Sequence, residues 1–451
     1  MCLLQMIKQA AIDNKPILVS KESSVYFSDI LVLQHKFCAL QKKKQVACVA
    51  IYDLGYINTA KLIVALDSMV ETVILIPGDV NETVCHKLCV DNNIDLVIHS
   101  GSIKLHHLVD ITIEQLYQQD DEEPDKKSSI ETCWVLMTSG TTGSPKLVSH
   151  TMYSLTNTVK KSSKFPSGIW GLFYSPYRFA GMQVLLQSII TGNELVVSEY
   201  CNSLKDTLKL FADKHVNFVS ATPTIWRKVL MTEYAELLSL DVITLGGEIV
   251  DQNILNALKK QYPKARLIHI YASTEAGSGF SVSDGFSGFP KAYFNNEQLP
   301  FNIDISSQST LLIKSSSQAK GYLGNSSFPI DENGYIDTGD VIELIGDRGF
   351  FKGRENGSIN VGGLKVHPEE VESVLLSHPK VKLASVSAKK NPITGAIVTA
   401  QLVIISQELS NKEMIKEIKA YCRERLEAYK VPALMKIIDD ISINSTGKTV
   451  R

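Results

Sequence analysis

The sequence predicts an α/β fold in which a large N-terminal domain of α/β subdomains precedes a small α+β domain. Three observations lead to this prediction. Strand-like apolar runs alternate with helix-like stretches over most of the chain. After residues 334–356 the pattern changes to short strands, turns and charged helices. The chain has 451 residues, which is more than one hydrophobic core usually serves. We therefore expect two domains, residues 1–354 and 355–451.

Apolar runs predict the strands of the N-terminal part. They lie at 46–54, 70–77, 94–100, 132–138, 195–200, 217–223, 241–248 and 266–273. The stretch 57–70 is typical of a helix, and the charged segment 118–129 is typical of a surface loop. Several of the strands end in glycine, proline or small polar residues. Because ligands of open α/β sheets bind at the carboxyl ends of strands, we expect the functional site there.

Two helix-like stretches, 366–378 and 411–430, stand out in the C-terminal part. Strand and turn patterns surround both of them. The sequence shows no internal repeat and no low-complexity tract.

The composition excludes several classes of protein. A formal net charge of −2 argues against a protein that binds nucleic acid through a basic face. The chain has 44% hydrophobic and 21% charged residues and lacks an apolar run of about 18 residues, so we expect no membrane span. The first residues do not resemble a signal peptide, and the eight cysteines are scattered. We expect a cytoplasmic location.

Residues 137–150, MTSGTTGSPKLVSH, combine hydroxyls, glycines and a lysine. Such a loop can hold an anion, since glycine lets backbone N–H groups approach oxygens closely. Phosphate is the first candidate for that anion. The residues expected to bind it are Thr138, Ser139, Gly140, Thr141, Thr142, Gly143 and Lys146.

This loop does not fit the P-loop of nucleotidases. That motif places its lysine directly after a glycine and a serine or threonine after the lysine. Here Ser144 and Pro145 precede Lys146, and Leu147 follows it. A second lysine, in Gly447-Lys448-Thr449, fails as well, because Ser442 stands where the first glycine is required.

The loop is instead similar to the phosphate-binding loop of the adenylate-forming enzyme superfamily. This superfamily includes acyl-CoA synthetases, adenylation domains of peptide synthetases and firefly-type luciferases. Four further stretches resemble its motifs, in its order: YASTE at 271–275, YIDTGD at 335–340, GREN at 353–356 with GGLKVHPEEVE at 362–372, and NSTGKTVR at 444–451. The resemblance extends from about residue 134 to 451.

The resemblance implies two half-reactions. A carboxylate attacks the α-phosphorus of ATP to give an acyl adenylate and pyrophosphate, and a thiol then displaces AMP. Lys448 would bridge the reacting carboxylate and the α-phosphate, Thr274 would bind that phosphate, and Glu275 would hold Mg²⁺. The remaining nucleotide contacts implied by the resemblance come from Tyr271 at the adenine, Asp340 and Arg354 at the ribose, and Gly246, Gly247 and Glu248 beside the adenine.

The resemblance also implies a mobile C-terminal domain. Rotation about Asn356 would exchange Lys448 for the strand region 362–365, so that one pocket serves both half-reactions. Gly362, Gly363 and Lys365 would then receive the thiol arm of the acceptor. The superfamily often has Asp or Lys at this hinge, whereas this chain has Asn356.

The acid pocket would be lined by Arg178, Phe179, Gly181, Ser220 and Ala272. Members that activate amino acids usually carry an aspartate in this region, whereas residues 177–181 read YRFAG. A plain or aromatic carboxylic acid is thus favoured over an amino acid. Arg178 could pair with a second anionic group of the substrate, or it could have a structural or CoA-facing role.

Two acceptors remain open at this point. Free CoA is favoured, while Leu147, where the family commonly has glycine, resembles stand-alone enzymes that load a phosphopantetheine carrier protein. A further alternative is a nucleotide-binding relative without catalytic activity. The sequence does not indicate the identity of the acid or the oligomeric state.

Overall fold

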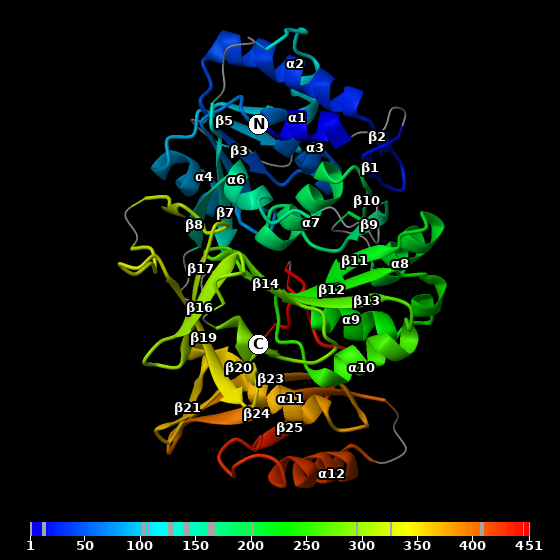
Figure 1. The fold of residues 1–451 in the computed structure, drawn as a ribbon, viewed down its shortest axis with the longest axis vertical. Helices are drawn as coiled ribbons and strands as arrows, with labels where there is room; N and C mark the ends of the chain where they lie inside the picture. The colour runs from blue at the N-terminus through cyan, green and yellow to red at the C-terminus, as the bar shows by residue number, and fades with distance from the viewer. Residues whose placement is uncertain are drawn as a thin grey trace.

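The computed structural model describes residues 2–10, 15–101, 105, 108–124, 130–138, 145–160, 167–199, 203–294, 296–324, 327–405, 410–444 and 446–450. Among these residues the strands form four sheets, with helices packed against them (Figure 1). The first sheet lies in the upper half of Figure 1, the second extends from there to the middle of the molecule, and the fourth lies at the bottom.

The first sheet has the strand order β18-β8-β7-β4-β3-β5-β6. Its strands are β3 (Cys48–Tyr52), β4 (Thr72–Ile76), β5 (Leu96–His99), β6 (Asp110–Thr112), β7 (Cys133–Thr138), β8 (Lys146–Thr151) and β18 (Gly321–Tyr322). Its helices are α2 (Phe27–Lys44), α3 (Tyr56–Leu66), α4 (Glu82–Asp91) and α5 (Ile113–Tyr117). The central strands β3, β4, β5 and β7 run parallel, and their residues are almost all buried. This burial explains their continuous apolar runs.

The second sheet has the strand order β14-β13-β12-β11-β9-β10-β1-β2. Its strands are β1 (Leu18–Val19), β2 (Ser24–Val25), β9 (Ile169–Leu172), β10 (Glu194–Val197), β11 (Phe218–Ala221), β12 (Val242–Gly246), β13 (Arg266–Ser273) and β14 (Gly277–Val282). The helical elements along it are α1 (Leu3–Ala10), α6 (Met152–Thr156), α7 (Phe179–Ile190), α8 (Leu204–Asp213), α9 (Pro223–Leu230), η1 (Glu233–Leu237) and α10 (Gln252–Gln261). One hydrophobic core, which includes Trp134 and Leu185, joins this sheet to the first.

The third sheet is antiparallel, in the order β15-β20-β19-β17-β16. Its elements are β15 (Phe289–Pro290), η2 (Lys291–Tyr293), β16 (Phe301–Ile305), β17 (Thr310–Ser315), β19 (Ile336–Ile345) and β20 (Arg348–Arg354). An aromatic cluster that includes Phe280, Phe289 and Phe301 fills its core. Phe280 belongs to β14, so this cluster attaches the third sheet to the second.

The fourth sheet has its own core and is formed by the C-terminal part. Its elements are η3 (Glu355–Gly357), β21 (Ile359–Val361), β22 (Leu364–Val366), α11 (Pro368–Leu376), β23 (Val381–Asn391), β24 (Gly395–Ile404), α12 (Asn411–Arg423) and β25 (Leu434–Ile437). The helix expected over 411–430 ends at Arg423, because the chain turns there and brings Leu426 into the core. The α/β fold with an α+β C-terminal unit is confirmed, and the boundary at 354/355 stays a proposal.

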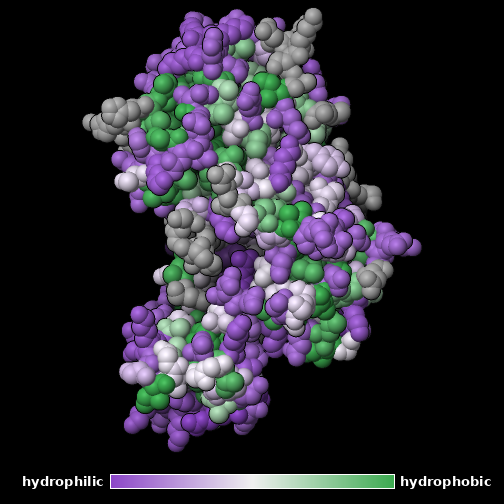
Figure 2. Space-filling model, turned by 90° about the vertical axis from the view of Figure 1, so that its left-hand side faces the viewer, coloured by the Kyte–Doolittle hydropathy of each residue, from purple (hydrophilic) through white to green (hydrophobic). Residues whose placement is uncertain are grey.

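The helices described above do not include one that combines the length and the apolar run of a bilayer crossing. On the face shown in Figure 2, hydrophilic residues cover much of the surface, and apolar residues are scattered between them.

Candidate active site

The carboxyl ends of four parallel strands, β9, β11, β12 and β13, lie at one edge of the second sheet. Gly246 of β12 is paired with Ile270 of β13, so Gly247 and Tyr271 follow on neighbouring strands at this edge. Thr222 follows β11 in the same way. The sequence prediction of a site at strand ends directs attention here.

The β7–β8 hairpin carries the expected phosphate loop. Thr138 at the end of β7 is paired with Lys146 at the start of β8. Ser139, Gly140, Thr141, Thr142 and Gly143 lie outside the described residues. The ammonium of the exposed Lys146 donates a 3.3 Å hydrogen bond to the hydroxyl of Tyr322 and lies 4.7 Å from the centre of its ring.

Tyr322 connects Lys146 to the expected magnesium ligand. Its hydroxyl donates a 3.2 Å hydrogen bond to Oε1 of Glu275. Burial and the nearby Glu275 carboxylate raise the pKa of Tyr322, so the hydroxyl keeps its proton at neutral pH. Tyr322 cannot be recognised from the sequence, because β18 has two residues and carries none of the motifs.

His150 supports the loop that bears Thr274 and Glu275. Its Nε2 lies 2.7 Å from the carbonyl oxygen of Thr274, and its Nδ1 lies 3.0 Å from Oγ of Ser154. Burial lowers the pKa of His150 to about 4, against the opposing effect of the Thr274 carbonyl. Since a carbonyl only accepts, the neutral ring donates from Nε2. His150 stands in the phosphate-loop stretch, yet its sequence context suggested no role.

Asp340 is the centre of a second polar group. Tyr271 donates a 2.6 Å hydrogen bond from its hydroxyl to Oδ2, and Arg354 donates a 3.1 Å hydrogen bond from Nε to Oδ1. The carboxylate raises the pKa of Arg354; burial and the same carboxylate raise the pKa of Tyr271. The Tyr271 ring stacks against Phe280 and Phe351, and its contact with adenine stays a prediction.

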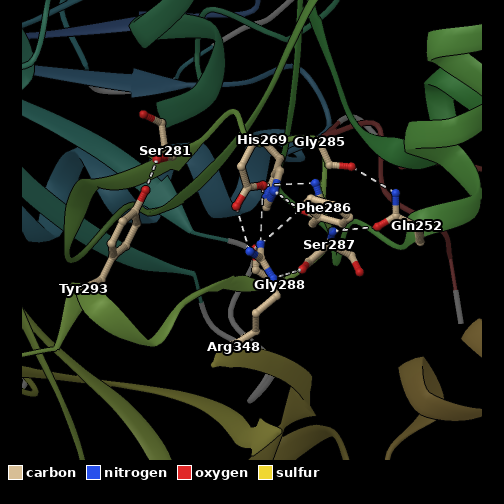
Figure 3. A network of polar contacts seen from close by, with 10 residues as sticks. Gln252, His269, Ser281, Gly285, Phe286, Ser287, Gly288, Tyr293 and Arg348 are labelled. Carbon is tan, nitrogen blue, oxygen red and sulfur yellow. Dashed lines mark hydrogen bonds and ion pairs between the residues drawn. The ribbon is translucent and has the colours of Figure 1, made fainter. Parts of the chain in front are cut away.

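A polar network joins the strands that carry Tyr271 and Arg354 (Figure 3). Arg348, on the same strand as Arg354, binds the carbonyls of Phe286, Ser287 and Gly288. His269 of β13 lies 3.0 Å from the Phe286 carbonyl through Nε2. The segment 286–288 therefore links β13 to β20. This link fixes Tyr271 on β13 relative to Arg354 on β20, the two residues that bind Asp340.

The C-terminal loop places Lys448 at the edge of the second sheet. In Figure 1 the red end of the chain rises to the middle of the molecule, beside β12 and α9. Gly247 has φ +80°, and a Cβ added there would lie 3.4 Å from Cε of Lys448. The stem of the expected catalytic lysine thus passes over a residue without a side chain, next to the strand end that carries Tyr271.

Glu248 and Gly246 have contacts other than those expected from the sequence. Oε1 of Glu248 accepts from the backbone N–H of Thr449 at 3.0 Å, and Oε2 accepts from that of Thr224 at 2.9 Å. The Gly246 carbonyl accepts from the hydroxyl of Tyr174 at 3.3 Å. Contact of these residues with a nucleotide stays a prediction.

Arg178 lies at the N-terminal end of α7 with most of its side chain buried. Nη1 donates to the carbonyl of Met137 at 3.0 Å, and Nη2 pairs with the carboxylate of Asp79 at 3.0 Å. Met137 lies near the end of β7, so Arg178 connects this strand end to α7 and to the segment after β4. This geometry favours the structural role over the pairing of a substrate anion.

The other residues expected around the acid lie near the same edge. Phe179 lies 5.5 Å from the His150 ring, and Ser220 is buried in β11. Gly181 leaves no room for a side chain, because a Cβ would lie 2.0 Å from the carbonyl oxygen of Ser175. Ala272 is half-buried at the end of β13. Their contact with an acid stays a prediction.

The residues expected to meet the thiol have their described contacts within the C-terminal part of the chain. The N–H of Gly362 donates to Thr394 and that of Gly363 to Asn360, both within the fourth sheet. Lys365 is exposed and lies 3.8 Å from Glu355. Asn356 is exposed in η3, between the third and fourth sheets. The structure therefore presents Lys448, and not the glycine turn, to the edge of the second sheet.

A magnesium ion is the metal that the sequence analysis implies. Among the described residues there is no group of three His, Cys, Asp or Glu side chains that could hold a metal. Glu275 alone would supply one carboxylate. This donor set fits Mg²⁺, which usually takes one or two carboxylates and completes its coordination with water and substrate phosphates.

Comparison with protein families assigns the chain to a family. Residues 46–298 match the family model of AMP-binding enzymes, and residues 370–448 match that of the AMP-binding enzyme C-terminal domain. The first match covers more than half of the chain. The protein therefore belongs to the AMP-binding enzyme family, within the adenylate-forming superfamily that the motifs resemble.

The chain is similar to ligases that act on carboxylic acids. It is 29% identical to a 2-succinylbenzoate–CoA ligase of Bacillus velezensis, over 76% of this chain and 72% of that protein. Two solved structures share the fold. They are o-succinylbenzoate CoA synthetase of Bacillus subtilis with its acyl-adenylate intermediate (TM-score 0.78, 20% identity, 99% and 96% coverage) and anthranilate CoA ligase with anthranoyl-AMP (TM-score 0.85, 18% identity, 100% and 95% coverage).

Proposed function

We propose that the protein is an AMP-forming acid–CoA ligase. It activates a carboxylic acid with ATP as an acyl adenylate, releases pyrophosphate, and transfers the acyl group to the thiol of CoA. The observation that carries this proposal is the position of Lys448 over Gly247, at the strand edge where Tyr271 binds Asp340. Lys448, which would bind the reacting phosphate, and Asp340, which would bind the ribose, are thereby brought to the same edge of the second sheet.

In the first half-reaction, an oxygen of the acid attacks the α-phosphorus, and the bond to the pyrophosphate oxygen breaks. Negative charge is then spread over the phosphoryl oxygens, so fixed cations lower the barrier. Lys448 neutralises charge between the carboxylate and the α-phosphate, and Lys146 neutralises charge on the leaving pyrophosphate. Glu275 would hold Mg²⁺, which would supply further positive charge against that of the phosphates.

The nucleotide is oriented by Asp340. Its two oxygens are directed by Tyr271 and Arg354, which leaves further lone pairs for the 2′ and 3′ hydroxyls of the ribose. Thr138 and the residues up to Gly143 hold the β- and γ-phosphates, Thr274 holds the α-phosphate, and Gly246 and Gly247 border the adenine. The acid lies beside Phe179, Gly181, Ser220 and Ala272.

The second half-reaction requires a different arrangement of the C-terminal unit. Residues 355–451 rotate about Asn356 as one domain against 1–354. Gly362, Gly363 and Lys365 then replace Lys448, and the thiol arm of CoA approaches the acyl carbonyl past the two glycines. The sulfur attacks that carbonyl, and AMP leaves.

2-Succinylbenzoate is the first acid to test, because the relative from Bacillus velezensis is a ligase for it. The absence of an aspartate in residues 177–181 agrees with an acid that carries no ammonium group. A carrier-protein thiol remains the second candidate acceptor, favoured by Leu147. We expect the enzyme in the cytoplasm, where ATP and CoA are available.

The test measures pyrophosphate release with Mg²⁺-ATP and a panel of 2-succinylbenzoate, benzoate and anthranilate. CoA and a phosphopantetheinylated carrier protein are then supplied in parallel, and the thioester is measured. We expect pyrophosphate with at least one acid, a thioester with CoA, and neither product in significant amount from Lys448→Ala. Tight nucleotide binding without pyrophosphate from any acid would instead support a binding protein without catalytic activity.

A further inference from the structure

The backbone on both sides of Lys448 is held by the region around the N-terminus of α9. On one side, Oγ1 of Thr222 donates a 2.6 Å hydrogen bond to the carbonyl of Gly447. On the other side, the N–H of Thr449 donates a 3.0 Å hydrogen bond to Oε1 of Glu248. The hydroxyls of Thr449 and Thr224 lie 3.1 Å apart. The lysine is therefore bracketed by two anchors that are separated from it by more than 190 residues of chain.

Both anchors are themselves fixed. Thr222 is fully buried and caps α9, since its Oγ1 accepts from the N–H of Ile225 at 3.1 Å. Glu248 accepts from the N–H of Thr224 through its second oxygen, at 2.9 Å. A carboxylate at a helix N-terminus is favoured by the unpaired N–H groups and the helix dipole. The two groups that hold the lysine loop are thus preorganised by one helix end.

Two glycines permit this close approach. Gly447 is buried with φ +73°, and a Cβ there would lie 2.5 Å from Cδ1 of Ile225. Gly247 leaves room for the Lys448 stem on the other side. Any side chain at either position would be strained by the positive φ, and a side chain at Gly447 would also clash with Ile225 of α9.

We propose that Glu248 is a positioning residue for the adenylation half-reaction, acting through the backbone of Thr449 to hold Lys448 at the reacting phosphate. This inference rests on the proposed function. The consequence that distinguishes it is that Glu248 influences only the adenylation half-reaction. The hydrogen bond exists only while the lysine loop lies on α9, so it stabilises the arrangement that forms the adenylate. Once the C-terminal domain rotates, Glu248 no longer contacts the loop and does not influence thioester formation.

The test compares Glu248→Gln with the matched control Glu236→Gln, an exposed glutamate on η1. Glutamine keeps the shape of the side chain, but its NH2 group replaces one of the two carboxylate oxygens, so one of the two N–H groups loses its acceptor. Adenylation is measured in a single turnover as pyrophosphate release without CoA. Thioester formation is measured by adding CoA to the acyl adenylate supplied ready-made. We expect adenylation to slow about tenfold to hundredfold and thioester formation to change less than twofold.

Two further measurements test whether the effect of Glu248 passes through the Lys448 loop. Thr222→Val, which removes the other anchor, should show the same selectivity. In a Lys448→Ala background, Glu248→Gln should not reduce the slow residual rate of adenylation, measured at high enzyme concentration, because its effect passes through that lysine. Equal slowing of both half-reactions, or full additivity with Lys448→Ala, would overturn the proposal.

Amide hydrogen exchange separates this inference from the proposed function. If the wild-type protein releases no pyrophosphate with any acid, the ligase proposal fails. The contacts of Thr222 and Glu248 with the Lys448 loop are then assessed from amide hydrogen exchange in a peptide that spans 444–450, with ATP present. We expect faster exchange in Glu248→Gln than in Glu236→Gln. Unchanged protection of this peptide would show that Glu248 does not hold the loop.

Discussion

The hydroxyl of Tyr271 donates a 2.6 Å hydrogen bond to Asp340, and this contact joins the second sheet to the third. Burial of Tyr271 and the charge of Asp340 raise the pKa of the phenol, so the proton stays on the tyrosine and the carboxylate stays an acceptor. The bond thereby directs one oxygen of the carboxylate while Arg354 directs the other.

Tyr271→Phe removes this bond and keeps the ring stacked on Phe280 and Phe351. We expect the affinity for AMP, measured by calorimetry, to fall about fivefold, corresponding to about 1 kcal/mol for one hydrogen bond. Tyr293→Phe is the matched control, because its hydroxyl binds the Ser281 carbonyl away from Asp340. Equal affinities in the two variants would contradict an orienting role of Tyr271.

Tyr322→Phe should weaken the use of Mg²⁺-ATP. The substitution keeps an aromatic ring beside the Lys146 ammonium but removes the hydroxyl that binds both Lys146 and Glu275. We expect the KM for Mg²⁺-ATP in pyrophosphate release to rise about threefold to tenfold, which corresponds to about 1 kcal/mol. Tyr153→Phe, an exposed position on α6, controls for the change of residue type. An unchanged KM at limiting Mg²⁺ would exclude a role of this bridge in binding the metal–nucleotide complex.

These two tyrosines differ in how far the sequence indicates their roles. Tyr271 lies in a contiguous motif, and a contiguous motif can be recognised without knowledge of the fold. Tyr322 contacts Glu275 across 47 positions, and His150 contacts Thr274 across 124 positions. Such pairs arise only when the strands β8, β18 and β13 are assembled, and no local pattern encodes that assembly.

The strands of the fold also differ in how far the sequence indicates them. Long apolar strands such as β3 and β4 are visible in the sequence, because burial on both faces requires a continuous apolar run. The two-residue strand β1 is not visible in the sequence, and its parallel pairing with β10 joins residues 177 positions apart, such as Leu18 and Leu195. Glu248 shows the limit within the site. Its position at a strand end suggested the nucleotide, while its observed contacts are with Thr224 and Thr449.

His150 should make the protein less stable in mild acid. Its pKa in the folded protein is about 4, below its ordinary value of 6.5. Between these two values the unfolded chain binds a proton that the folded protein does not, so stability falls as pH falls through this window. From pH 7.5 to 5.0 we expect this residue alone to lower the free energy of unfolding by about 2 kcal/mol.

The measurement is urea denaturation of the wild type and of His150→Gln at both pH values. His269 and His378 also have pKa values lowered by burial, but both proteins contain them, so their effects cancel in the comparison. The variant should be less stable at pH 7.5 and should lose about 2 kcal/mol less between the two pH values. Parallel losses in the two proteins would mean that His150 is not held neutral.

Arg178 should act on stability and not on the choice of acid. Its guanidinium binds Asp79 and the carbonyl of Met137, one residue before the phosphate loop begins. A structural role predicts that Arg178→Ala lowers the melting temperature and slows pyrophosphate release with every acid by a similar factor. Asp79→Asn should have a smaller effect in the same direction, and the two substitutions together should cost less than their sum, because they share one interaction.

The alternative is that Arg178 binds a second carboxylate of the substrate. In that case Arg178→Ala would selectively reduce activity with the dicarboxylate 2-succinylbenzoate relative to benzoate, while Asp79→Asn would leave this ratio unchanged. The ratio of the two rates in the four proteins therefore decides between a residue that orders the phosphate loop and one that selects the acid.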